Sequence, residues 1–414
     1  MTEDLIDFSL PENESSIIKV IGVGGGGGNA VNYMYQQGIK DVDFVICNTD
    51  AQALENSTIP VKIQLGESLT EGRGAGNKPE RGEQSAIENL DDVVEVLADN
   101  TKMVFITAGM GGGTGTGAAP VIAKAAKEMG ILTVGIVTIP FRFEGRQRLN
   151  QAIEGINNLK ENVDSLLVIN NEKLSEIYGD LKLSTAFSKA DDVLATAAKG
   201  IAEIITLHGY INVDFEDVKT VMTDSGVAVM GSASAEGEDR AVNAIREALT
   251  SPLLNSNDVR GARNILLNIT SGQEEVTMDE VGQITDYVQE AVGDSASIIW
   301  GTGQDLALNS KVSVTIIATG FENGSIPEEK AKPKSTVFQA RRAQGSAAEQ
   351  TRMLLEEEAK ESVQKEEKKL NLSELKDSEI DEIESVPAYK RKQQNLEDKH
   401  YRSGNVIKFT LDEE

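Results

Sequence analysis

Short apolar runs alternate with segments of helical spacing along the chain up to about Asn170. The apolar runs are rich in β-branched residues and have the length of buried strands, and the segments between them repeat apolar residues every three or four positions. Repeated strand and helix units of this kind form a parallel sheet with helices on both faces and ligands at the carboxyl ends of the strands. We predict strands at 17–23, 44–49, 102–108, 132–139 and 165–169.

The pattern changes after this region. One long segment, from about Ser184 to Gly209, keeps helical spacing, and three apolar runs of strand length follow it. These runs lie at 265–269, 298–301 and 312–318. We therefore predict an α/β fold with a flexible N-terminus at 1–15, a parallel-sheet domain at 16–183, a central helix at 184–210 and a smaller α+β domain at 211–320.

Charged residues dominate the chain beyond Phe321, where Glu and Lys recur at positions four apart. We interpret 321–378 as a charged disordered linker. The next segment, 379–394, combines isoleucine anchors, Pro387 and a basic cluster. Such a combination is typical of a short peptide that becomes ordered on binding a partner.

An extra tail at 395–414 follows this peptide and carries an apolar patch at 405–411. Two interpretations stay open for the patch. It is either a second docking strand or an accessory segment that binds nothing.

A run of glycines and threonines at 111–117 lies between a predicted strand and a predicted helix at 118–130. The first N–H groups of a helix have no partner within it, and the helix dipole adds partial positive charge at the same end. Glycines let the main chain approach a ligand closely, and the hydroxyls of Thr114 and Thr116 add donors. The run therefore predicts a phosphate site.

A second glycine run, 24–28 with Asn29, follows the first strand and opens a helix from Ala30 to about Gln37. Alone, Gly22 to Gly27 matches the weak dinucleotide fingerprint GxGxxG, and Asp50 lies where a ribose-binding acid is expected. A dehydrogenase that uses NAD is therefore a competing hypothesis. Two glycine cradles suit a triphosphate better than one pyrophosphate, and no hydride-transfer pair accompanies the first run.

Composition narrows the function further. The net charge of −27 argues against nonspecific nucleic-acid binding and against adhesion to an anionic membrane. With Cys47 as the only cysteine and two histidines, no internal disulfide, histidine metal site or Ser-His-Asp triad is expected. We found no apolar leader and no long uncharged apolar stretch, so we expect a cytoplasmic protein without direct membrane insertion.

The glycine runs, Asn48-Thr49-Asp50, the segment Pro140 to Gly145 and the segment Asn212 to Val218 together resemble the tubulin/FtsZ family over about 17–319. The resemblance implies a Rossmann-like GTPase domain that binds GTP and GDP, with Mg²⁺ held mainly through the nucleotide phosphates. It also implies head-to-tail self-assembly into protofilaments and a bacterial division ring at midcell. Membrane-tethering and regulatory division proteins would bind the peptide Ile380 to Lys392, although Lys390 stands where relatives often carry an apolar residue.

The same resemblance assigns roles to individual residues. The phosphate loops would be Gly25, Gly26, Gly27, Gly28 and Asn29 together with Gly111, Gly112, Gly113, Thr114 and Gly115, and Asn48 belongs to the same nucleotide site. Ala75 would lie near the γ-phosphate, and Glu144 and Arg148 would contact the ribose. Asp192 would read guanine, since a carboxylate accepts from both N1–H and the N2 amine. Without the resemblance, we would interpret Asp192 as an acidic residue that the dipole at a helix N-terminus stabilises.

Three polar residues after the central helix complete the predicted chemistry. Glycine loops supply no group that orients an attacking water, whereas Asp214 and Asp217 can point the same way from a loop that leads into a helix. In the family this loop, with Asn212, enters the nucleotide site of the next subunit. Hydrolysis would then require assembly; a filament scaffold that does not hydrolyse its nucleotide is the alternative hypothesis.

Overall fold

The computed structural model describes residues 15–39, 41–177, 182–206, 210–250, 259–293 and 295–321. The predicted linker, the partner-binding peptide at 379–394 and the tail at 395–414 lie outside the described residues, as does nearly all of the predicted N-terminus. No helix in the described part of the chain is both long and apolar enough to cross a membrane.

Ten strands form one sheet in the order β3-β2-β1-β4-β5-β6-β7-β10-β8-β9. The strands β1 to β6 pair in parallel, β10 runs antiparallel to both β7 and β8, and β9 is parallel to β8. The strands are β1 (Ile18–Val23), β2 (Asp43–Asn48), β3 (Val61–Gln64), β4 (Met103–Gly109), β5 (Leu132–Ile139), β6 (Ser165–Asn170), β7 (Gly226–Ala235), β8 (Asn264–Ser271), β9 (Ser297–Gln304) and β10 (Val312–Thr319).

The helices fill the connections between the strands. They are α1 (Gly24–Gln36), α2 (Ala51–Glu55), α3 (Glu67–Thr70), α4 (Pro79–Glu88), α5 (Leu90–Ala98), α6 (Thr114–Glu128), α7 (Arg146–Lys160), α8 (Asn171–Ile177), α9 (Leu183–Thr206), α10 (Phe215–Met222), α11 (Arg240–Leu249) and α12 (Met278–Val292). Two short 3₁₀ turns, η1 (Arg142–Glu144) and η2 (Leu306–Leu308), follow β5 and β9. This mixed α/β fold with a mostly parallel sheet confirms the predicted fold class.

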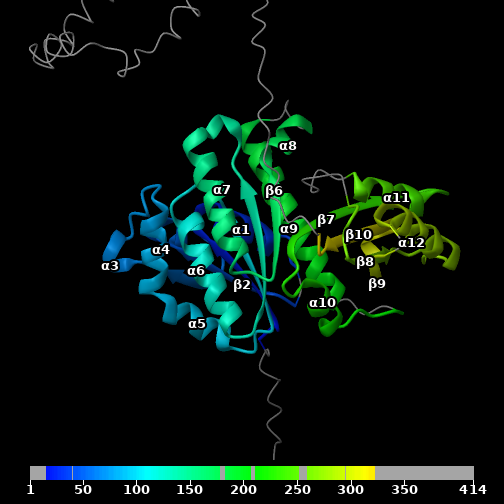
Figure 1. Cartoon of the computed structure of the whole chain (residues 1–414), viewed down its shortest axis with the longest axis horizontal. Coiled ribbons are helices and arrows are strands. Elements are labelled where there is room, and N and C mark those ends of the chain that lie inside the picture. The colour runs from blue at the N-terminus through cyan, green and yellow to red at the C-terminus, as the bar shows by residue number, and fades with distance from the viewer. Residues whose placement is uncertain are drawn as a thin grey trace, which may run out of the picture. The chain divides into compact units, whose positions relative to one another are not determined.

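Both faces of the parallel sheet are covered, because its strands are apolar on both sides. Residues of α5, α6 and α7 bury one face, and residues of α1, α9 and α10 bury the other. The C-terminal part of the sheet packs its own core against α11 and α12 (Figure 1).

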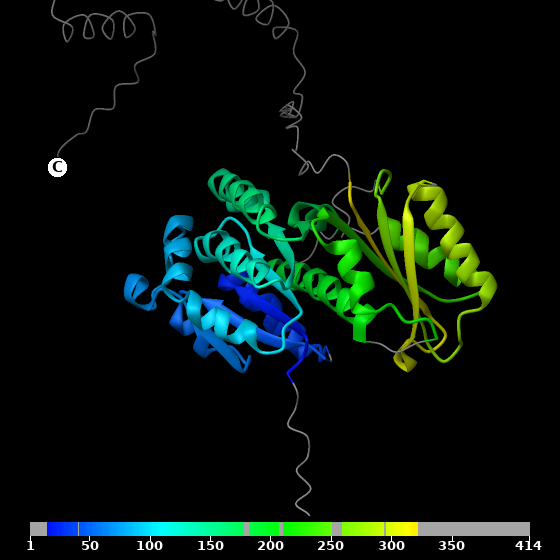
Figure 2. The ribbon, with the colours of Figure 1, turned by 60° about the horizontal axis from the view of Figure 1, so that its bottom comes forward.

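The helix α9 joins the two halves of the sheet through a shared core. Its buried residues, among them Leu194 and Ile201, pack in one cluster with residues of the parallel strands and with Met230, Leu266 and Ile317 of the C-terminal strands. Figure 2 shows this helix, in green, running between the two halves. The strand β7 adds a backbone link, since it pairs with β6 on one side and with β10 on the other.

The first glycine run and the second run from Thr114 on lie inside helices, which differs from the prediction that helices begin after them. The helix α1 begins at Gly24 rather than at Ala30, and α6 begins at Thr114 rather than at residue 118. Pro120 therefore lies inside α6 and not in its first turn. Glycine has a poor helix propensity, and here tight packing of the first turns outweighs it.

The other predicted elements agree with the structure to within a few residues. The strand predicted at 132–139 is β5, and the central helix predicted at 184–210 corresponds to α9, which runs from Leu183 to Thr206. Residues 207–209 lie outside the described part of the chain, and Tyr210 is in a bend. Local apolar patterning therefore placed these elements correctly, although it did not fix their ends.

Candidate functional site

The two glycine runs meet at the carboxyl ends of β1 and β4, which are neighbours in the sheet. A Cβ atom on Gly24, whose φ is +72°, would lie 2.8 Å from the backbone nitrogen of Gly115. A Cβ atom on Gly26 would lie 3.0 Å from the Cα atom of Gly109. Only residues without a side chain allow the main chains to approach this closely. Tertiary packing therefore brings the two predicted phosphate loops together.

The other side of these loops is open. Ideal Cβ atoms on Gly25, Gly28 and Gly112 would meet nothing within 4 Å. No side chain caps the N-terminus of α1 or of α6, where the flanking residues are Val23 and Gly113. The unpaired N–H groups and positive dipole ends of two helices therefore face the same open space, which fits a chain of phosphate groups.

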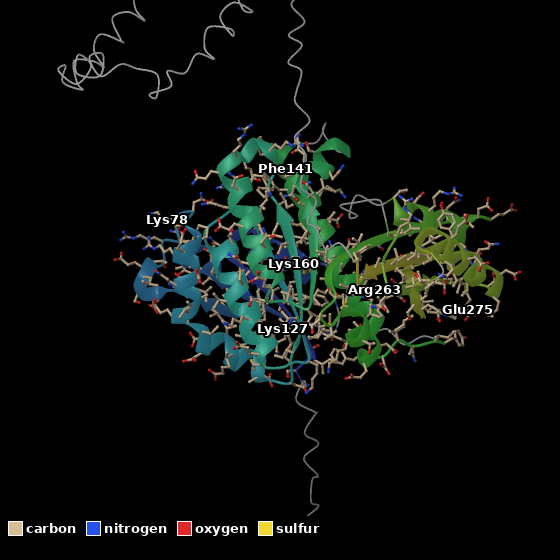
Figure 3. The ribbon with its side chains drawn as sticks, in the orientation of Figure 1. Lys78, Lys127, Phe141, Lys160, Arg263 and Glu275 are labelled. Atoms are coloured by element: carbon tan, nitrogen blue, oxygen red, sulfur yellow. The ribbon has the colours of Figure 1, made fainter. Side chains whose placement is uncertain are left out.

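The loop between α3 and α4 forms a third side of this space. A Cβ atom on Gly113 would lie 2.8 Å from the Cβ of Ala75 and 2.9 Å from the backbone nitrogen of Lys78. Ala75 is buried, and the distance of 2.8 Å places it directly against the second glycine run. Figure 3 labels Lys78 at this edge, and places Phe141 and Lys127 at opposite ends of the parallel sheet.

Asn48 lies at the end of β2, next to the first side of the site. Its side chain is buried, and its Oδ1 accepts a hydrogen bond of 3.3 Å from the backbone nitrogen of Asp50. The following residue, Thr49, shares a hydrogen bond of 2.7 Å with Thr114 through their hydroxyl oxygens. This buried contact ties the end of β2 to the first residue of α6, and no sequence pattern indicated it.

Glu144 and Arg148 lie beside the second glycine run. A Cβ atom on Gly111 would lie 2.6 Å from the carbonyl oxygen of Arg148. The two side chains form an ion pair of 2.8 Å, and Glu144 also accepts a hydrogen bond of 3.0 Å from the backbone nitrogen of Phe141. The carboxylate is thus held in place by the start of η1, with hydrogen-bonding groups next to the phosphate space.

Asp192 lies on α9 where this helix crosses α1. One carboxylate oxygen accepts a hydrogen bond of 3.0 Å from the hydroxyl of Tyr33, and the other lies 3.3 Å from Nζ of Lys189. Burial and the neighbouring carboxylate raise the pKa of Tyr33, so its hydroxyl stays a donor. Tyr33 is eight residues beyond Gly25, or ~12 Å along α1. That distance suits a nucleotide with its phosphates at the helix start and its base near Asp192.

An aromatic cluster that no sequence pattern marked as a site includes Phe187, which lies on α9 five residues before Asp192. Phe187 contacts Phe141 edge to face, with ring centroids 5.3 Å apart, and Phe141 stacks on Phe143 at 5.0 Å. Phe143 and Phe187 are exposed although they are large and apolar. Exposed rings can stack on a flat base. The only sequence signal was the pair of phenylalanines within 140–145, because Phe187 is far away along the chain.

Asn212, Asp214 and Asp217 are not brought together with the nucleotide-binding candidates. The part of α9 from Asp192 to Thr206 is ~21 Å long, and these three residues follow its far end. Figure 1 shows α10 at the opposite end of the parallel sheet from α8. Within one chain, the predicted catalytic carboxylates therefore cannot contact a nucleotide bound at the glycine loops.

Asp214 and Asp217 lie together at the start of α10. Asp214 is the residue before the helix, and its carboxylate accepts a hydrogen bond of 2.9 Å from the backbone nitrogen of Asp217. Asp217 accepts one of 3.2 Å from the backbone nitrogen of Asp214. Both side chains thus occupy fixed positions at one surface. No group of three or more histidine, cysteine, aspartate or glutamate residues suited to a metal ion occurs among the described residues.

Comparison with known proteins agrees with this arrangement. The model of the tubulin/FtsZ family GTPase domain matches residues 17–179, and that of the FtsZ family C-terminal domain matches residues 226–322. The cell division protein FtsZ of Porphyromonas gingivalis is 50% identical over 325 residues, which cover 78% of this chain and 71% of that protein. The FtsZ of Pseudomonas aeruginosa is 49% identical and covers 83% of this chain and 87% of its own length.

Solved structures show the same fold. An FtsZ dimer from M. jannaschii superposes with a TM-score of 0.69 at 43% identity and covers 74% of this chain and 88% of that chain. CetZ2 from Haloferax volcanii, solved as a GTPγS-bound protofilament, has a TM-score of 0.63 at 22% identity and covers 74% and 93%. The chain therefore belongs to the tubulin/FtsZ family and is a GTPase of its FtsZ branch.

Proposed function

We propose that this GTPase assembles head to tail into protofilaments and forms the cytoskeletal ring of bacterial cell division. The observation that carries the proposal is the separation of the site into two halves. The glycine loops form an open phosphate cradle at one end of the chain, and the exposed Asp214 and the half-buried Asp217 lie at the other. A second copy could unite the halves. One relative of known structure is described as an FtsZ dimer, and the curated relatives are named cell division proteins.

The nucleotide would bind along α1 with its phosphates at the two helix starts. Gly25 and Gly26 of the first run and Gly112 to Gly115 of the second would donate backbone N–H groups. Gly27, Gly28, Asn29 and Gly111, whose N–H groups are already paired within the protein, would line the phosphate space. Ala75 would lie near the terminal phosphate. Glu144 and Arg148 would bind the ribose hydroxyls beside Gly111. Asp192 would accept hydrogen bonds from the base, and Phe187 would stack on it. Asn48 supports the site from the end of β2.

Hydrolysis would be completed by the loop of the adjacent subunit. The carboxylates of Asp214 and Asp217, with Asn212, would orient a water molecule toward the terminal phosphate and accept its proton. Mg²⁺ bound mainly to the nucleotide phosphates would offset their negative charge. The carboxylates are held by the cap of α10, so they would reach the neighbouring site in a defined geometry.

The surface around this loop supports the self-association. Tyr210 and Ile211 precede the loop, Met278 begins α12 and Leu306 begins η2, and all four are exposed. Exposed large apolar residues that gather at one end of a molecule mark a site of protein association. We propose that this end docks on the nucleotide face of the next subunit.

Partners that tether or regulate the ring would bind the peptide Ile380 to Lys392, outside the described residues.

The test is to measure sedimentation and phosphate release together, over a range of protein concentrations with GTP. We expect turnover per subunit to rise with the assembled fraction and to be negligible below the assembly threshold. Turnover that is independent of concentration would contradict completion of the site by a neighbour. Wild-type filaments that pellet without releasing phosphate would favour the scaffold that does not hydrolyse GTP.

A pair of variants separates the loop from general surface charge. Asp217→Asn keeps an acceptor for the cap of α10 and removes the carboxylate, so we expect GTP binding and pelleting with little phosphate release. Glu216→Gln is the matched control, because Glu216 is the exposed neighbour whose ion pair within the described residues is with Lys219, at 3.9 Å. Wild-type turnover by Asp217→Asn would overturn the assignment.

A further inference from the structure

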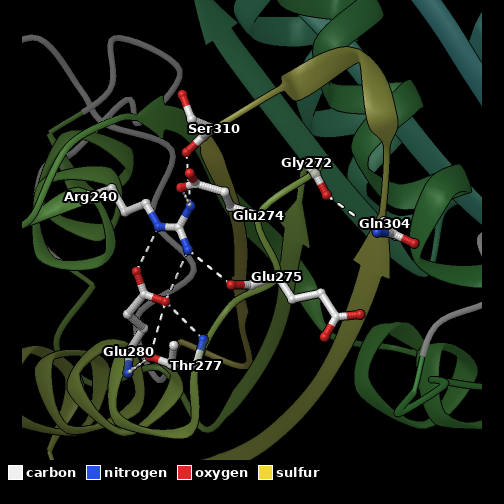
Figure 4. Close-up of polar contacts among 8 residues, drawn as sticks. All are labelled: Arg240, Gly272, Glu274, Glu275, Thr277, Glu280, Gln304 and Ser310. Atoms are coloured by element: carbon white, nitrogen blue, oxygen red, sulfur yellow. Dashed lines mark hydrogen bonds and ion pairs between the residues drawn. The ribbon is translucent and has the colours of Figure 1, made fainter.

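Arg240, the first residue of α11, lies at the centre of a polar network in the C-terminal half of the chain (Figure 4). Its side chain is only 8% exposed. Nε and Nη2 contact the two carboxylate oxygens of Glu280 at 2.6 and 3.2 Å. Nη1 donates to the carbonyl oxygen of Ser310 at 2.8 Å and to the carboxylate of Glu274 at 3.3 Å, and Nη2 donates to the carbonyl oxygen of Glu275 at 3.0 Å.

This network fixes the short connection between β8 and α12. Arg240 holds it at Glu274 and Glu275, and Glu280 caps the start of α12 through the backbone nitrogen of Thr277 at 2.8 Å. At the other end of the connection, Nε2 of Gln304 donates to the carbonyl oxygen of Gly272 at 3.3 Å (Figure 4). The connection is therefore anchored to α11, α12 and β9, with its backbone in one position.

The side chain of Glu275 extends from this anchored backbone to the segment that follows α9. Its carboxylate accepts a hydrogen bond of 3.1 Å from the hydroxyl of Tyr210. Tyr210 is 88% exposed, and within the described residues this hydrogen bond holds its side chain. Asn212 follows two residues later. The hydrogen bond between Tyr210 and Glu275, the first tether of this segment, thus lies immediately before the loop that carries the predicted catalytic residues.

A second tether holds the next residues of the same loop. Ile211 forms an isolated antiparallel bridge with Thr302 of β9, and its carbonyl oxygen accepts a hydrogen bond of 2.9 Å from the backbone nitrogen of Thr302. Val213 is buried against Gly301, where a Cβ atom would lie 2.8 Å from Cγ2 of Val213. The bridge fixes the position of Ile211, and the hydrogen bond to Glu275 fixes the residue before it. Together the two contacts set the direction in which the chain enters the loop.

We propose that Tyr210 and Glu275 are positioning residues for GTP hydrolysis, with Arg240 as the anchor that holds Glu275 in place. Their hydrogen bond sets the angle at which the loop from Asn212 to Asp217 leaves α9 and meets the nucleotide of the adjacent subunit. The inference rests on the proposed completion of the site by a neighbour. It concerns the rate of hydrolysis, because neither residue belongs to the nucleotide-binding end.

Conservative variants of the full-length chain test the pair. Tyr210→Phe removes only the hydroxyl donor, and Glu275→Ala removes the acceptor. We expect each to lower the kcat for GTP per pelleted subunit about 2- to 10-fold, the range that one modest hydrogen bond supports. The KM for GTP and the melting temperature should stay at wild-type values, and dividing by pelleted subunits removes any change in assembly from the comparison.

Two further variants identify the hydrogen bond as the cause. Glu275→Gln keeps an oxygen that accepts from the Tyr210 hydroxyl, so its kcat should lie close to that of the wild type. Tyr287→Phe makes the same chemical change on α12, away from the loop, and should leave kcat unchanged. Wild-type kcat in Tyr210→Phe, or an equal loss in Glu275→Gln and Glu275→Ala, would overturn the inference.

Asp217→Asn, measured in the same assay, distinguishes this inference from the proposed function. If Asp217→Asn loses turnover and Tyr210→Phe does not, only the positioning role fails. If Asp217→Asn also turns over at the wild-type rate, the proposed function fails, and the positioning role fails with it.

Discussion

Asp214 and Asp217 each accept a hydrogen bond from the backbone nitrogen of the other, at 2.9 and 3.2 Å, so the two predicted catalytic carboxylates also form the N-terminal cap of α10. An alanine at either position would remove both the charge and the cap. The two roles can be separated, because asparagine caps a helix about as well as aspartate does but carries no charge.

We therefore expect Asp214→Ala to lower the free energy of unfolding by about 0.5–2 kcal/mol, the cost of a lost N-terminal cap. Asp214→Asn should unfold like the wild type, and both variants should lose most phosphate release. Chemical denaturation and the phosphate assay measure the two properties separately. If Asp214→Asn hydrolysed GTP at the wild-type rate, the carboxylate would have only the structural role.

Gly25 lies on the open side of the first predicted phosphate loop, and its position gives a second prediction. Nothing lies within 4 Å of a Cβ atom on Gly25, so Gly25→Ala should fold without strain and stabilise α1 by up to about 1 kcal/mol. The new methyl group would occupy space that a phosphate needs, so GTP affinity should fall at least about 10-fold, which corresponds to ~1.4 kcal/mol.

Gly282→Ala is the matched control for Gly25→Ala. Gly282 lies inside α12, and its Cβ position is also open. This variant should gain similar stability without any change in GTP affinity, as measured by isothermal titration calorimetry. An unchanged affinity in Gly25→Ala would exclude this face of α1 from the phosphate site.

Asp192 should discriminate guanine by the N2 amine. Inosine triphosphate lacks this amine, so we expect the wild type to bind it about 10- to 100-fold more weakly than GTP, as one charge-assisted hydrogen bond allows. Asp192→Ala should weaken GTP binding and remove most of this preference. Competition binding with the two nucleotides measures the ratio. A ratio that does not change in Asp192→Ala would assign base recognition to another group.

Asp191, the neighbour of Asp192, provides a prediction about pH. Burial raises the pKa of its carboxyl to about 6 from an ordinary value of 3.8. The folded state therefore binds this proton more tightly than the unfolded state, so the carboxylate destabilises the fold at neutral pH and this penalty decreases as the pH falls from about 6 toward 4. Asp191→Asn should melt a few degrees above the wild type at pH 7.5, and the difference should shrink at pH 5. A constant difference between pH 5 and 7.5 would contradict the assignment.

Glu280 should respond to pH in the opposite direction. Its hydrogen bond from Arg240 lowers the pKa of its carboxyl below the ordinary 4.5. The ionised pair therefore stabilises the fold above about pH 4.5, and this contribution is lost as the pH falls through the lower pKa of the folded state. Glu280→Gln should be less stable by about 1–3 kcal/mol at pH 7, with a flatter dependence below pH 4.5. Thermal melts from pH 3 to 7 test this; a wild-type pH profile in Glu280→Gln would contradict it.

Several features of this protein were determined by local sequence. The strands β4, β5 and β6 were predicted because a buried parallel strand is apolar along its whole length and needs no distant information to be recognised. The two glycine runs were also placed correctly after a strand, at the start of a helical segment. Their composition indicated backbone contact with a ligand, although it did not show that the helices begin inside them.

The tertiary structure alone decided which distant residues meet. The contact between Phe187 and Phe141, the hydrogen bond from Tyr33 to Asp192 and the tether from Tyr210 to Glu275 join segments between 46 and 159 residues apart. Such pairs leave no periodic signal, because each depends on how whole elements pack. The sequence by itself therefore determined most of the strands and the central helix. Packing of α9 between the two halves of the sheet decided that the glycine loops and the two carboxylates lie at opposite ends of one chain.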